Sequence, residues 1–395
     1  MAAEAGTSAE LAQVRFQRPS LPPAERIEHH LSRSRAAHWI SNGGPCWQLL
    51  RDALAERTGA YCVPVASGTL GLMAAVAAVR TAAPAAPGAL PRTALLPSFT
   101  FPATAQAAAW AGLEPRLLDV DPGHWHLSPD QLEHELWERG EQVALVIAVS
   151  SFGTPPPPDV RCRWEAACAD AGVPLIVDSA AGFGAVGADG VPIGCQGDVE
   201  VVSFHATKPF GIGEGGAVFT RDSALCERLE LLVNFGLGAD RSVQLPLGLN
   251  GKMSELHAAT ALAVLEEFDT LLDARRAAAA TLRDAADPSI AWQGDCERST
   301  WQFVPALHPD AAAARRTETR SAERVETRRY YLPLHRMAAF RDAAVAESGL
   351  AATDALAARL VCLPMAADLT AAELARVADA LGAPQREPLA APQRG

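Results

Sequence analysis

Lys208 stands among residues whose types and spacing could do covalent chemistry on an aldehyde. An apolar run ends in Ser203, Lys208 follows five residues later, and a glycine-rich turn comes next, at 211–216. A second apolar run, at 174–177, is closed by Asp178. A lysine amine can form an imine, a hydroxyl can bind a phosphate, and a carboxylate can keep a pyridine nitrogen protonated. Together they predict a site for pyridoxal 5'-phosphate (PLP), with Lys208 and Asp178 as the catalytic residues.

Both catalytic candidates also have a simpler interpretation. Lys208 could be an exposed surface lysine, but the apolar strand before it and the glycine-rich turn after it make that less natural. Asp178 could cap the helix expected from Ala180 onward, and taken alone this explains it equally well. Ligands of open α/β sheets bind at the carboxyl ends of strands. A carboxylate there raises the pKa of a pyridine nitrogen by Coulomb attraction.

Residues 66–69 read Ala-Ser-Gly-Thr, where a predicted strand passes into a helix. Gly68 lets the backbone come close to a ligand, and the N–H groups that follow form a helix N-terminus, which binds anions. A plain helix cap by Ser67 or Thr69 is the alternative. The location in front of the first core helix of an α/β sheet favours a phosphate site.

Two phenylalanines follow the next predicted strand, in the sequence Pro-Ser-Phe-Thr-Phe at 97–101. One of them could stack on a flat ring, whereas core packing is the alternative for both. Phe101 lies beside the start of the next predicted helix, so it is the better candidate for stacking.

Two further patterns have simpler explanations. The turn at 211–216 contains a formal G-x-G-x-x-G, but it precedes a strand, at 217–220, where a dinucleotide fingerprint would open a helix. Residues 316–329 carry five Arg and three Glu. A solvated helix is the default interpretation, and contact of some of these arginines with a substrate diphosphate is the alternative.

Composition limits the class of protein. The 395 residues suffice for two domains, and 49% of them are apolar. The net charge of −12 argues against a nucleic-acid partner, which needs a basic surface. The eight cysteines form no C-x-x-C pair, so neither a zinc site nor a disulfide framework is expected. No apolar stretch could cross a bilayer and the first residues do not resemble a signal peptide, so we expect a cytoplasmic protein without a membrane partner.

Short apolar runs alternate with helical stretches over most of the chain. Helices are expected at 47–57, 69–79, 104–111, 129–138, 161–171 and 223–234, and strands at 61–65, 93–96, 115–119, 145–149, 174–177, 199–204 and 217–220. Continuous apolar strands between helices predict an α/β fold with a mostly parallel sheet covered on both faces. A long helical stretch from Ser254 to about Ala286 then leads into a smaller α+β domain, with a strand at 301–306 and helices at 355–360 and 371–381.

The predicted organisation has four parts. Residues 1–41 form an N-terminal arm, 42–270 a large cofactor-binding domain, 271–385 a smaller C-terminal domain, and 386–395 a tail rich in Pro, Ala and Arg.

Seven stretches in order resemble the StrS/DegT family of sugar aminotransferases, which are fold-type I PLP-dependent enzymes. They cover roughly residues 42–335, and seven in order are a specific signal where any single one would be weak. The stretches are Asn-Gly-Gly-Pro at 42–45, Ala-Ser-Gly-Thr at 66–69, Pro-Ser-Phe-Thr-Phe at 97–101, Leu-Asp-Val-Asp at 118–121, Asp178 with Phe183-Gly184, Ser-Phe-His-Ala-Thr-Lys at 203–208, and Asn-Gly-Lys-Met-Ser-Glu at 250–255.

The resemblance implies a role for each matching residue. Lys208 would form the imine with the cofactor and Asp178 would bind its ring nitrogen, while Phe101 would stack on the ring. Gly68, Thr69 and Ser203 would hold the phosphate. Asn250 would reach the phosphate of a neighbouring subunit, which implies a homodimer with shared active sites. His335, in Pro-Leu-His at 333–335, resembles a family stretch near the sugar.

One departure concerns the cofactor. Family members usually carry Glu-Asp-Ala-Ala-Gln around Asp178, and that Gln commonly contacts the ring hydroxyl of the cofactor. Here the run at 177–181 is Val-Asp-Ser-Ala-Ala, so Ala181 occupies the Gln position. Ser179 is a candidate to replace it. Residues 309–329 show no clear match to a family stretch, although substrate selectivity is expected there.

The resemblance implies a PLP-dependent aminotransferase. It would move an amino group from an amino acid, glutamate or glutamine, to a keto sugar, nucleotide-linked in the branch that this Ser-Phe-His-Ala-Thr-Lys form resembles, in amino-sugar biosynthesis. Two alternatives stay open: amination of a cyclitol or another non-nucleotide ketone, and a PLP-binding regulatory protein without turnover. The complete Lys208–Asp178 pair favours an enzyme.

Overall fold

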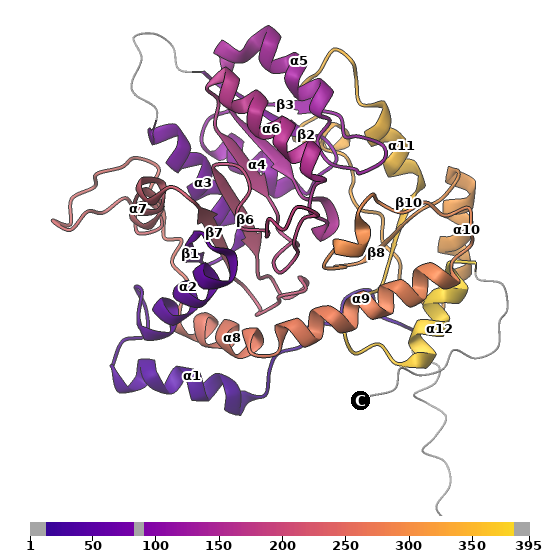
Figure 1. The fold of residues 1–395 in the computed structure, drawn as a ribbon, viewed down its shortest axis with the longest axis horizontal. Helices are drawn as coiled ribbons and strands as arrows, with labels where there is room; N and C mark the ends of the chain where they lie inside the picture. The colour runs from indigo at the N-terminus through magenta and orange to yellow at the C-terminus, as the bar shows by residue number, and fades with distance from the viewer. Residues whose placement is uncertain (1–12, 83–90, 383–395) are drawn as a thin grey trace, which may run out of the picture.

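A computed structural model of the chain describes residues 13–82 and 91–382, and its centre is an eight-stranded sheet (Figure 1). The strands run in the order β1-β7-β6-β5-β4-β2-β3-β9. Their bounds are β1 (Tyr61–Val65), β2 (Thr93–Pro97), β3 (Glu114–Leu118), β4 (Val143–Val149), β5 (Leu175–Asp178), β6 (Val199–Ser203), β7 (Gly216–Thr220) and β9 (Ala344–Val345). The seven strands predicted for the large domain are all present in this sheet.

Most neighbouring strands are parallel, as predicted. Only β7 runs against its neighbours, pairing antiparallel with both β1 and β6. Because β7 is reversed relative to both, β1 points the same way as β6, and β5, β4, β2 and β3 are parallel to β6 in turn. The carboxyl ends of these six strands therefore lie along one edge of the sheet.

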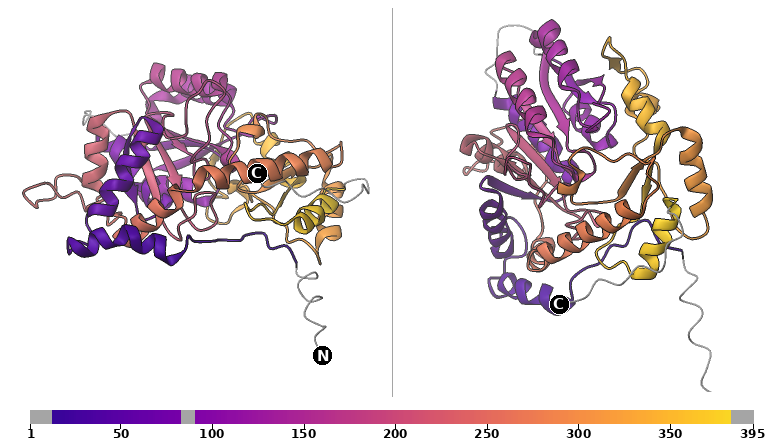
Figure 2. Two further views of the ribbon diagram at one scale, coloured as in Figure 1. Left: turned by 60° about the horizontal axis from the view of Figure 1, so that its bottom comes forward. Right: turned by 45° about the vertical axis from the view of Figure 1, so that its right-hand side comes forward.

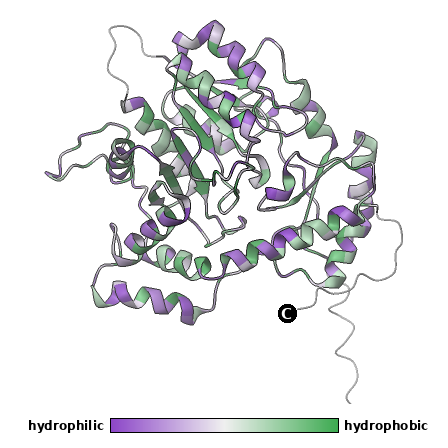
Figure 3. Ribbon diagram, viewed as in Figure 1, coloured by the Kyte–Doolittle hydropathy of each residue, from purple (hydrophilic) through white to green (hydrophobic). Residues whose placement is uncertain are grey.

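Helices cover both faces of the sheet, which is why its strands are apolar throughout. One face packs on α3 (Gly68–Ala82), α4 (Pro102–Trp110) and α7 (Ser223–Leu232). The other packs on α5 (Pro129–Arg139), α6 (Pro158–Ala171), α2 (Pro45–Thr58) and α8 (Glu255–Leu265). In Figure 3 the strands are hydrophobic, whereas α1 (Ala24–Ala36), on the outside of α8, is largely hydrophilic.

The long helical stretch predicted at 254–286 is two helices, so that prediction is wrong in one respect. α8 ends at Leu265 and α9 (Phe268–Ala285) begins three residues later, because Glu267 leaves helical geometry at φ −118° and ψ 2°. Phe268 is fully buried and its ring packs 4.9 Å from that of Phe210. The break thus lets one helix lie under the sheet and the next leave it.

The C-terminal elements lie to one side of the large sheet, and α9 leads from one to the other (Figure 1, Figure 2). β8 (Val304–Leu307) and β10 (Leu360–Leu363) form an antiparallel pair, which packs with α10 (Ala311–Ser321), α11 (Ala351–Arg359) and α12 (Ala371–Ala380). The predicted strand at 301–306 starts only at Val304, because Trp301 adopts a left-handed φ of 53°. The domain boundary at residue 270 stays a prediction.

The N-terminal segment contacts both parts, because α1 packs on α8 and the residues before α1 pack on the C-terminal elements. Val14 forms a parallel bridge with Val325, and the ring of Phe16 lies 4.6 Å from that of Phe303. Residues 1–12 of the predicted arm and the predicted tail at 386–395 lie outside the described residues. Within 13–82 and 91–382, no helix combines the length and the apolar character that crossing a membrane requires.

Candidate active site

Gly68 and Ser203 meet at the carboxyl edge of the sheet. A Cβ atom added to Gly68 would lie 2.8 Å from Cβ of Ser203, closer than side chains tolerate, so only glycine fits beside this serine. Gly68 follows β1 and opens α3, while Ser203 ends β6. Two segments that are far apart in the sequence thus form one small cradle.

The helix cap at this point is Ser67. Its hydroxyl accepts a hydrogen bond from the N–H of Leu70 at 3.2 Å, as in an ordinary N-cap. The N–H groups of Gly68 and Thr69, in the first turn of α3, have no acceptor within the helix. The cap and phosphate interpretations are therefore compatible, and this end of α3 offers donors to an anion.

Asp178 and Lys208 come together beside this cradle. Asp178 ends β5, is 5% exposed, and accepts hydrogen bonds from Thr104 Oγ1 at 2.7 Å and the N–H of Ala180 at 3.2 Å. Burial raises the pKa of the Asp178 carboxyl, against the opposing effects of Thr104 and the charge of Lys208. Burial lowers the pKa of Lys208 to about 8, although the charge of Asp178 acts against it. A lysine with this pKa is partly neutral, and thus nucleophilic, near physiological pH.

Two further residues, Gln302 and Tyr331, lie close to this pair without a signal in the sequence. Lys208 Nζ donates to Gln302 Oε1 at 3.4 Å. The ring of Tyr331 stacks on Phe152 at 5.1 Å, and the negative charge of Asp178 is among the causes that raise the pKa of its phenol, after burial and Cys362. Neither residue belongs to a recognisable motif, because both come from the irregular C-terminal segments.

Packing distinguishes the two candidate stacking residues. Phe99 is fully buried, with its ring 5.4 Å from that of Tyr331, so it belongs to the core. Phe101 stands at the start of α4 with 57% of its surface exposed, and its ring is free to cover a ligand. Its role as the stacking residue stays a prediction.

Ser179 does not replace the missing family glutamine. Its hydroxyl is fully buried and hydrogen-bonds with Ser150 Oγ at 2.9 Å and with the carboxylate of Glu200. Ala181 contributes only its carbonyl, which accepts from Thr300 Oγ1 at 2.7 Å. The expectation that Ser179 substitutes for that side chain is therefore wrong, because both of its hydrogen bonds hold it inside the protein.

The loop that follows α7 projects from the body of the molecule (Figure 1, Figure 2), and the bridge between Asn234 and Asn250 puts Asn250 at its base. Its backbone pairs with Asn234, and the next residue accepts from the N–H of Ala66 at 2.7 Å. The Asn250 side chain is exposed and has no hydrogen-bond partner within the described ranges. Its action on a neighbouring subunit stays a prediction.

His335 has both ring nitrogens engaged. Nδ1 hydrogen-bonds with Ser98 Oγ at 2.8 Å and Nε2 with Asp354 Oδ1 at 3.1 Å. The contacts join the end of β2 to α11, so they give His335 a structural role. A contact of His335 with a sugar stays a prediction.

Several charged residues of the arginine-rich segment at 316–329 pair with one another or lie in solvent. Arg329 forms two 2.7 Å hydrogen bonds to the carboxylate of Glu318, and Arg328 pairs with Glu326. Arg316 and Arg320 lie on the exposed side of α10. The predicted helix is present only as far as Ser321, where α10 ends, and several charges of the segment are paired within the chain.

The sequence profile of the DegT/DnrJ/EryC1/StrS aminotransferase family matches residues 23–382. The chain belongs to this family, and it is an aminotransferase with the fold of the PLP-dependent transferases. Protein Rv3402c of Mycobacterium tuberculosis is 35% identical to it over 379 residues, which cover 93% of this chain and 89% of that protein.

Relatives with named substrates are also similar. The dTDP-4-amino-4,6-dideoxy-D-glucose transaminase of Shigella dysenteriae is 28% identical over 364 residues, covering 89% of this chain and 94% of that protein. The L-glutamine:scyllo-inosose aminotransferase of Streptomyces griseus is 32% identical over 241 residues, covering 58% and 53%. The crystal structure of DesI in the presence of its TDP-sugar product superposes with a TM-score of 0.82 at 31% identity, covering 93% of this chain and 92% of that one.

Proposed function

We propose that this aminotransferase uses PLP to move an amino group from glutamate or glutamine to a nucleotide-linked keto sugar. The observation that carries the proposal is the Asp178–Lys208 pair beside the Gly68–Ser203 cradle, at the carboxyl edge of the sheet. The family of PLP-dependent aminotransferases supports the cofactor.

The residues present fit PLP. The free N–H groups that open α3 and the hydroxyl of Ser203 suit a phosphate, and the room beside Ser203 exists only because residue 68 is glycine. Asp178 is a buried carboxylate suited to a ring N–H, with Thr104 holding one of its oxygens. The exposed ring of Phe101 suits a planar ligand. When bound, PLP supplies an electron-accepting ring that stabilises negative charge on the carbon next to the nitrogen.

The two catalytic residues then have distinct tasks. Asp178 holds a proton at the pyridine nitrogen by charge attraction in a buried setting. Lys208 Nζ would hold the cofactor at its aldehyde carbon, and as a free amine it would be placed to carry a proton between the substrate carbon and the cofactor carbon. The lowered pKa of Lys208 suits this task, because an amine with a pKa of about 8 can both accept and return a proton near neutral pH.

The acceptor is inferred from relatives. The Shigella transaminase and the TDP-sugar complex of DesI support a nucleotide sugar, because the chain matches both over most of its length. A cyclitol is the second candidate, supported by the shorter match to the scyllo-inosose enzyme. A PLP-binding protein without turnover is disfavoured, since the Lys208–Asp178 pair is complete.

The working unit in this proposal is a homodimer. Large apolar side chains are exposed around α1, α2 and α8: Trp39 at 45%, Ile40 at 69%, Leu49 at 43% and Leu256 at 55%. Such surfaces mark protein–protein contacts. A two-fold interface would supply the exposed Asn250 twice, once to each active site.

A ligand screen by thermal shift tests the acceptor. We expect nucleoside-diphosphate sugars to raise the melting temperature of the PLP-loaded protein, because a ligand that binds only the folded state stabilises it. The free nucleoside diphosphates and scyllo-inosose serve as comparisons. A shift by the cyclitol alone would select the second candidate.

A further inference from the structure

We infer that Gln302 is a positioning residue for the Lys208 amine. The inference rests on the proposed function, which makes Lys208 the reactive amine. Gln302 is 5% exposed, its Oε1 lies 3.4 Å from Lys208 Nζ, and its Nε2 donates to the carbonyl of Thr207 at 3.3 Å. The side chain therefore contacts both the lysine and the backbone just before it.

The orientation of the Gln302 amide follows from its partners. A backbone carbonyl can only accept, so the NH₂ group must face Thr207 and the oxygen must face Lys208. An amide oxygen accepts a hydrogen bond from an amine whether the amine is charged or neutral. It carries no net charge, so it can orient Nζ without the large increase in pKa that a carboxylate would cause. Glutamine thus suits a lysine that must stay partly neutral.

The backbone around Gln302 is held firmly by its neighbours in a segment at 299–302, which we call the strap. Ser299 Oγ donates to the carbonyl of Phe152 at 3.3 Å, and Thr300 Oγ1 donates to that of Ala181 at 2.7 Å. Arg275 in α9 donates to the carbonyl of Trp301 at 3.1 Å. Each strap residue is therefore fixed by at least one hydrogen bond.

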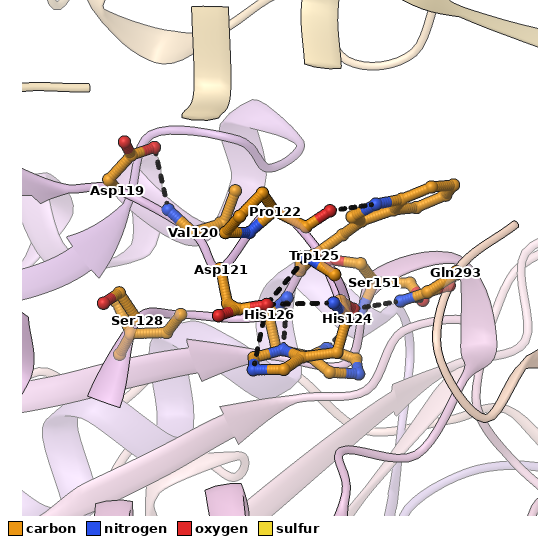
Figure 4. A network of polar contacts seen from close by, with 12 residues as sticks. Asp119, Val120, Asp121, Pro122, His124, Trp125, His126, Ser128, Ser151 and Gln293 are labelled. Carbon is orange, nitrogen blue, oxygen red and sulfur yellow. Dashed lines mark hydrogen bonds and ion pairs between the residues drawn. The ribbon is translucent and has the colours of Figure 1, made fainter. Parts of the chain in front are cut away.

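The chain leading into the strap is also anchored, at Gln293 (Figure 4). Gln293 Nε2 donates to the carbonyl of His124 at 2.8 Å, and Gln293 Oε1 accepts from Thr154 Oγ1 at 2.8 Å. The nearby His126 is fully buried, and burial lowers its pKa to about 3, so its ring stays neutral near physiological pH. Gln293 thus connects the loop after β3 with the loop after β4.

These contacts give the strap a defined task. The strap joins the loops that follow β4 and β5 to the lysine, and Gln293, just before it, adds the loop that follows β3. The left-handed turn at Trp301, with φ 53°, places the next side chain where it contacts Lys208. The C-terminal segment thereby sets the orientation of an amine that the large sheet supplies.

Lysine NMR on the cofactor-free chain tests the inference directly. The sequence contains two lysines, Lys208 and Lys252, so protein labelled with ¹³C-lysine gives two side-chain signals to titrate. Gln302→Glu places a carboxylate next to Lys208 and should raise its titration midpoint by about one to three pH units. The Lys252 signal should not move. Gln48→Glu, on the exposed side of α2, adds the same charge elsewhere and should leave Lys208 unchanged.

A second variant covers the case in which Gln302→Glu does not fold. Gln302→Met keeps the length of the side chain and removes the acceptor. We expect formation of the imine absorbance after PLP addition to slow on the order of tenfold, the effect of one lost orienting hydrogen bond.

Two outcomes would overturn the inference: an unchanged Lys208 midpoint in folded Gln302→Glu, or an unchanged imine-formation rate in Gln302→Met. Neither measurement uses an amino donor or a sugar. A shifted midpoint in a protein that transfers no amino group would leave the role of Gln302 standing and contradict the proposed function instead.

Discussion

Asp178 and Lys208 each feel the charge of the other, while burial disfavours the charged form of both. Neutral groups hydrogen-bond with both charged groups: the hydroxyl of Thr104 donates to the carboxylate, and the amide oxygen of Gln302 accepts from the amine. The result is a lysine that can lose its proton and a carboxylate whose hydrogen bonds favour the charged form. An aminotransferase needs both properties at the same edge of a sheet.

Replacing Asp178 by Asn should separate binding from catalysis. The amide keeps the shape of the side chain but no longer favours a protonated ring nitrogen, and each pKa unit of that effect corresponds to about 1.4 kcal/mol. We expect PLP binding to survive and the half-reaction with an amino donor to slow about a hundredfold or more. Rapid-mixing absorbance measures both. Near-normal half-reaction rates would show that Asp178 serves only as a cap.

Glu200 allows the effect of burial on a carboxyl pKa to be tested at a residue with no proposed catalytic role. It is fully buried, and burial raises its pKa from the usual 4.5 to about 7, against hydrogen bonds from Ser179 and two backbone N–H groups. The folded state therefore binds this proton more tightly than the unfolded state does. The resulting stability is present below pH 4.5 and lost as the pH rises through 7, a change of about 3 kcal/mol.

Comparison of the parent protein with Glu200→Gln isolates this effect from the other carboxylates. Between pH 4.5 and pH 8, the unfolding free energy of the parent should fall by about 3 kcal/mol relative to that of the variant. Urea denaturation at the two pH values measures the difference. Equal pH dependence in both proteins would mean that folding does not raise the pKa of Glu200.

At the scale of single residues, the sequence predicted those candidate site residues that stand in local motifs. Ser203, Lys208 and Asp178 each stand beside an apolar strand, and strand ends are where ligands of such sheets bind. Gln302 lies within a stretch that looks like a continuous strand, and only the left-handed turn at Trp301 brings it to Lys208. The two hydrogen bonds of Ser179 likewise depend on contacts across neighbouring strands, which residue order does not reveal.

Among the elements, the strands of the large sheet were predictable because they are buried on both faces and thus continuously apolar. The break between α8 and α9 was not, because Glu266 and Glu267 are ordinary helix formers. The helix ends there because Phe268 packs among distant aromatic rings. Tertiary packing overrode local preference at this point.

One element-scale contact joins the two parts of the chain. Asp119, just after β3, accepts hydrogen bonds from the N–H groups of Ala352 and Thr353 and from the Thr353 hydroxyl, at 2.7–2.8 Å. It therefore caps α11 from a distance. Asp119→Ala leaves these donors unpaired in a buried place, and we expect a loss of about 3 kcal/mol in unfolding free energy.

An ordinary local cap is the matched control. Ser128 accepts a hydrogen bond from the N–H of Gln131 at 3.3 Å at the start of α5. We expect Ser128→Ala to lower the unfolding free energy by about 1 kcal/mol. Urea denaturation compares the two variants. A loss in Asp119→Ala no larger than that in Ser128→Ala would mean that α11 is held by other contacts.

For the whole molecule, the dimer proposal makes a quantitative prediction about mixed subunits. Lys208→Ala and Asn250→Ala should each be inactive. A mixed dimer would hold one site with both defects and one site with neither. With half of the dimers mixed, activity should recover to about a quarter of the parent value. The measurement is the amino-transfer rate after co-refolding or subunit exchange.

Two results would contradict shared sites. One is full activity of Asn250→Ala alone. The other is no recovery in a mixture whose subunits demonstrably exchange, for example by native mass spectrometry of size-tagged chains.

The most direct test of the central claim is to find where PLP attaches. The account predicts that the protein with PLP is yellow and that borohydride bleaches the colour, leaving a reduced phosphopyridoxyl group on Lys208. Because the chain has only one other lysine, Lys252, peptide mass spectrometry distinguishes the two without ambiguity. Lys208→Ala should show no adduct. A protein that gains no absorbance band with PLP, or an adduct on Lys252 instead, would contradict the account.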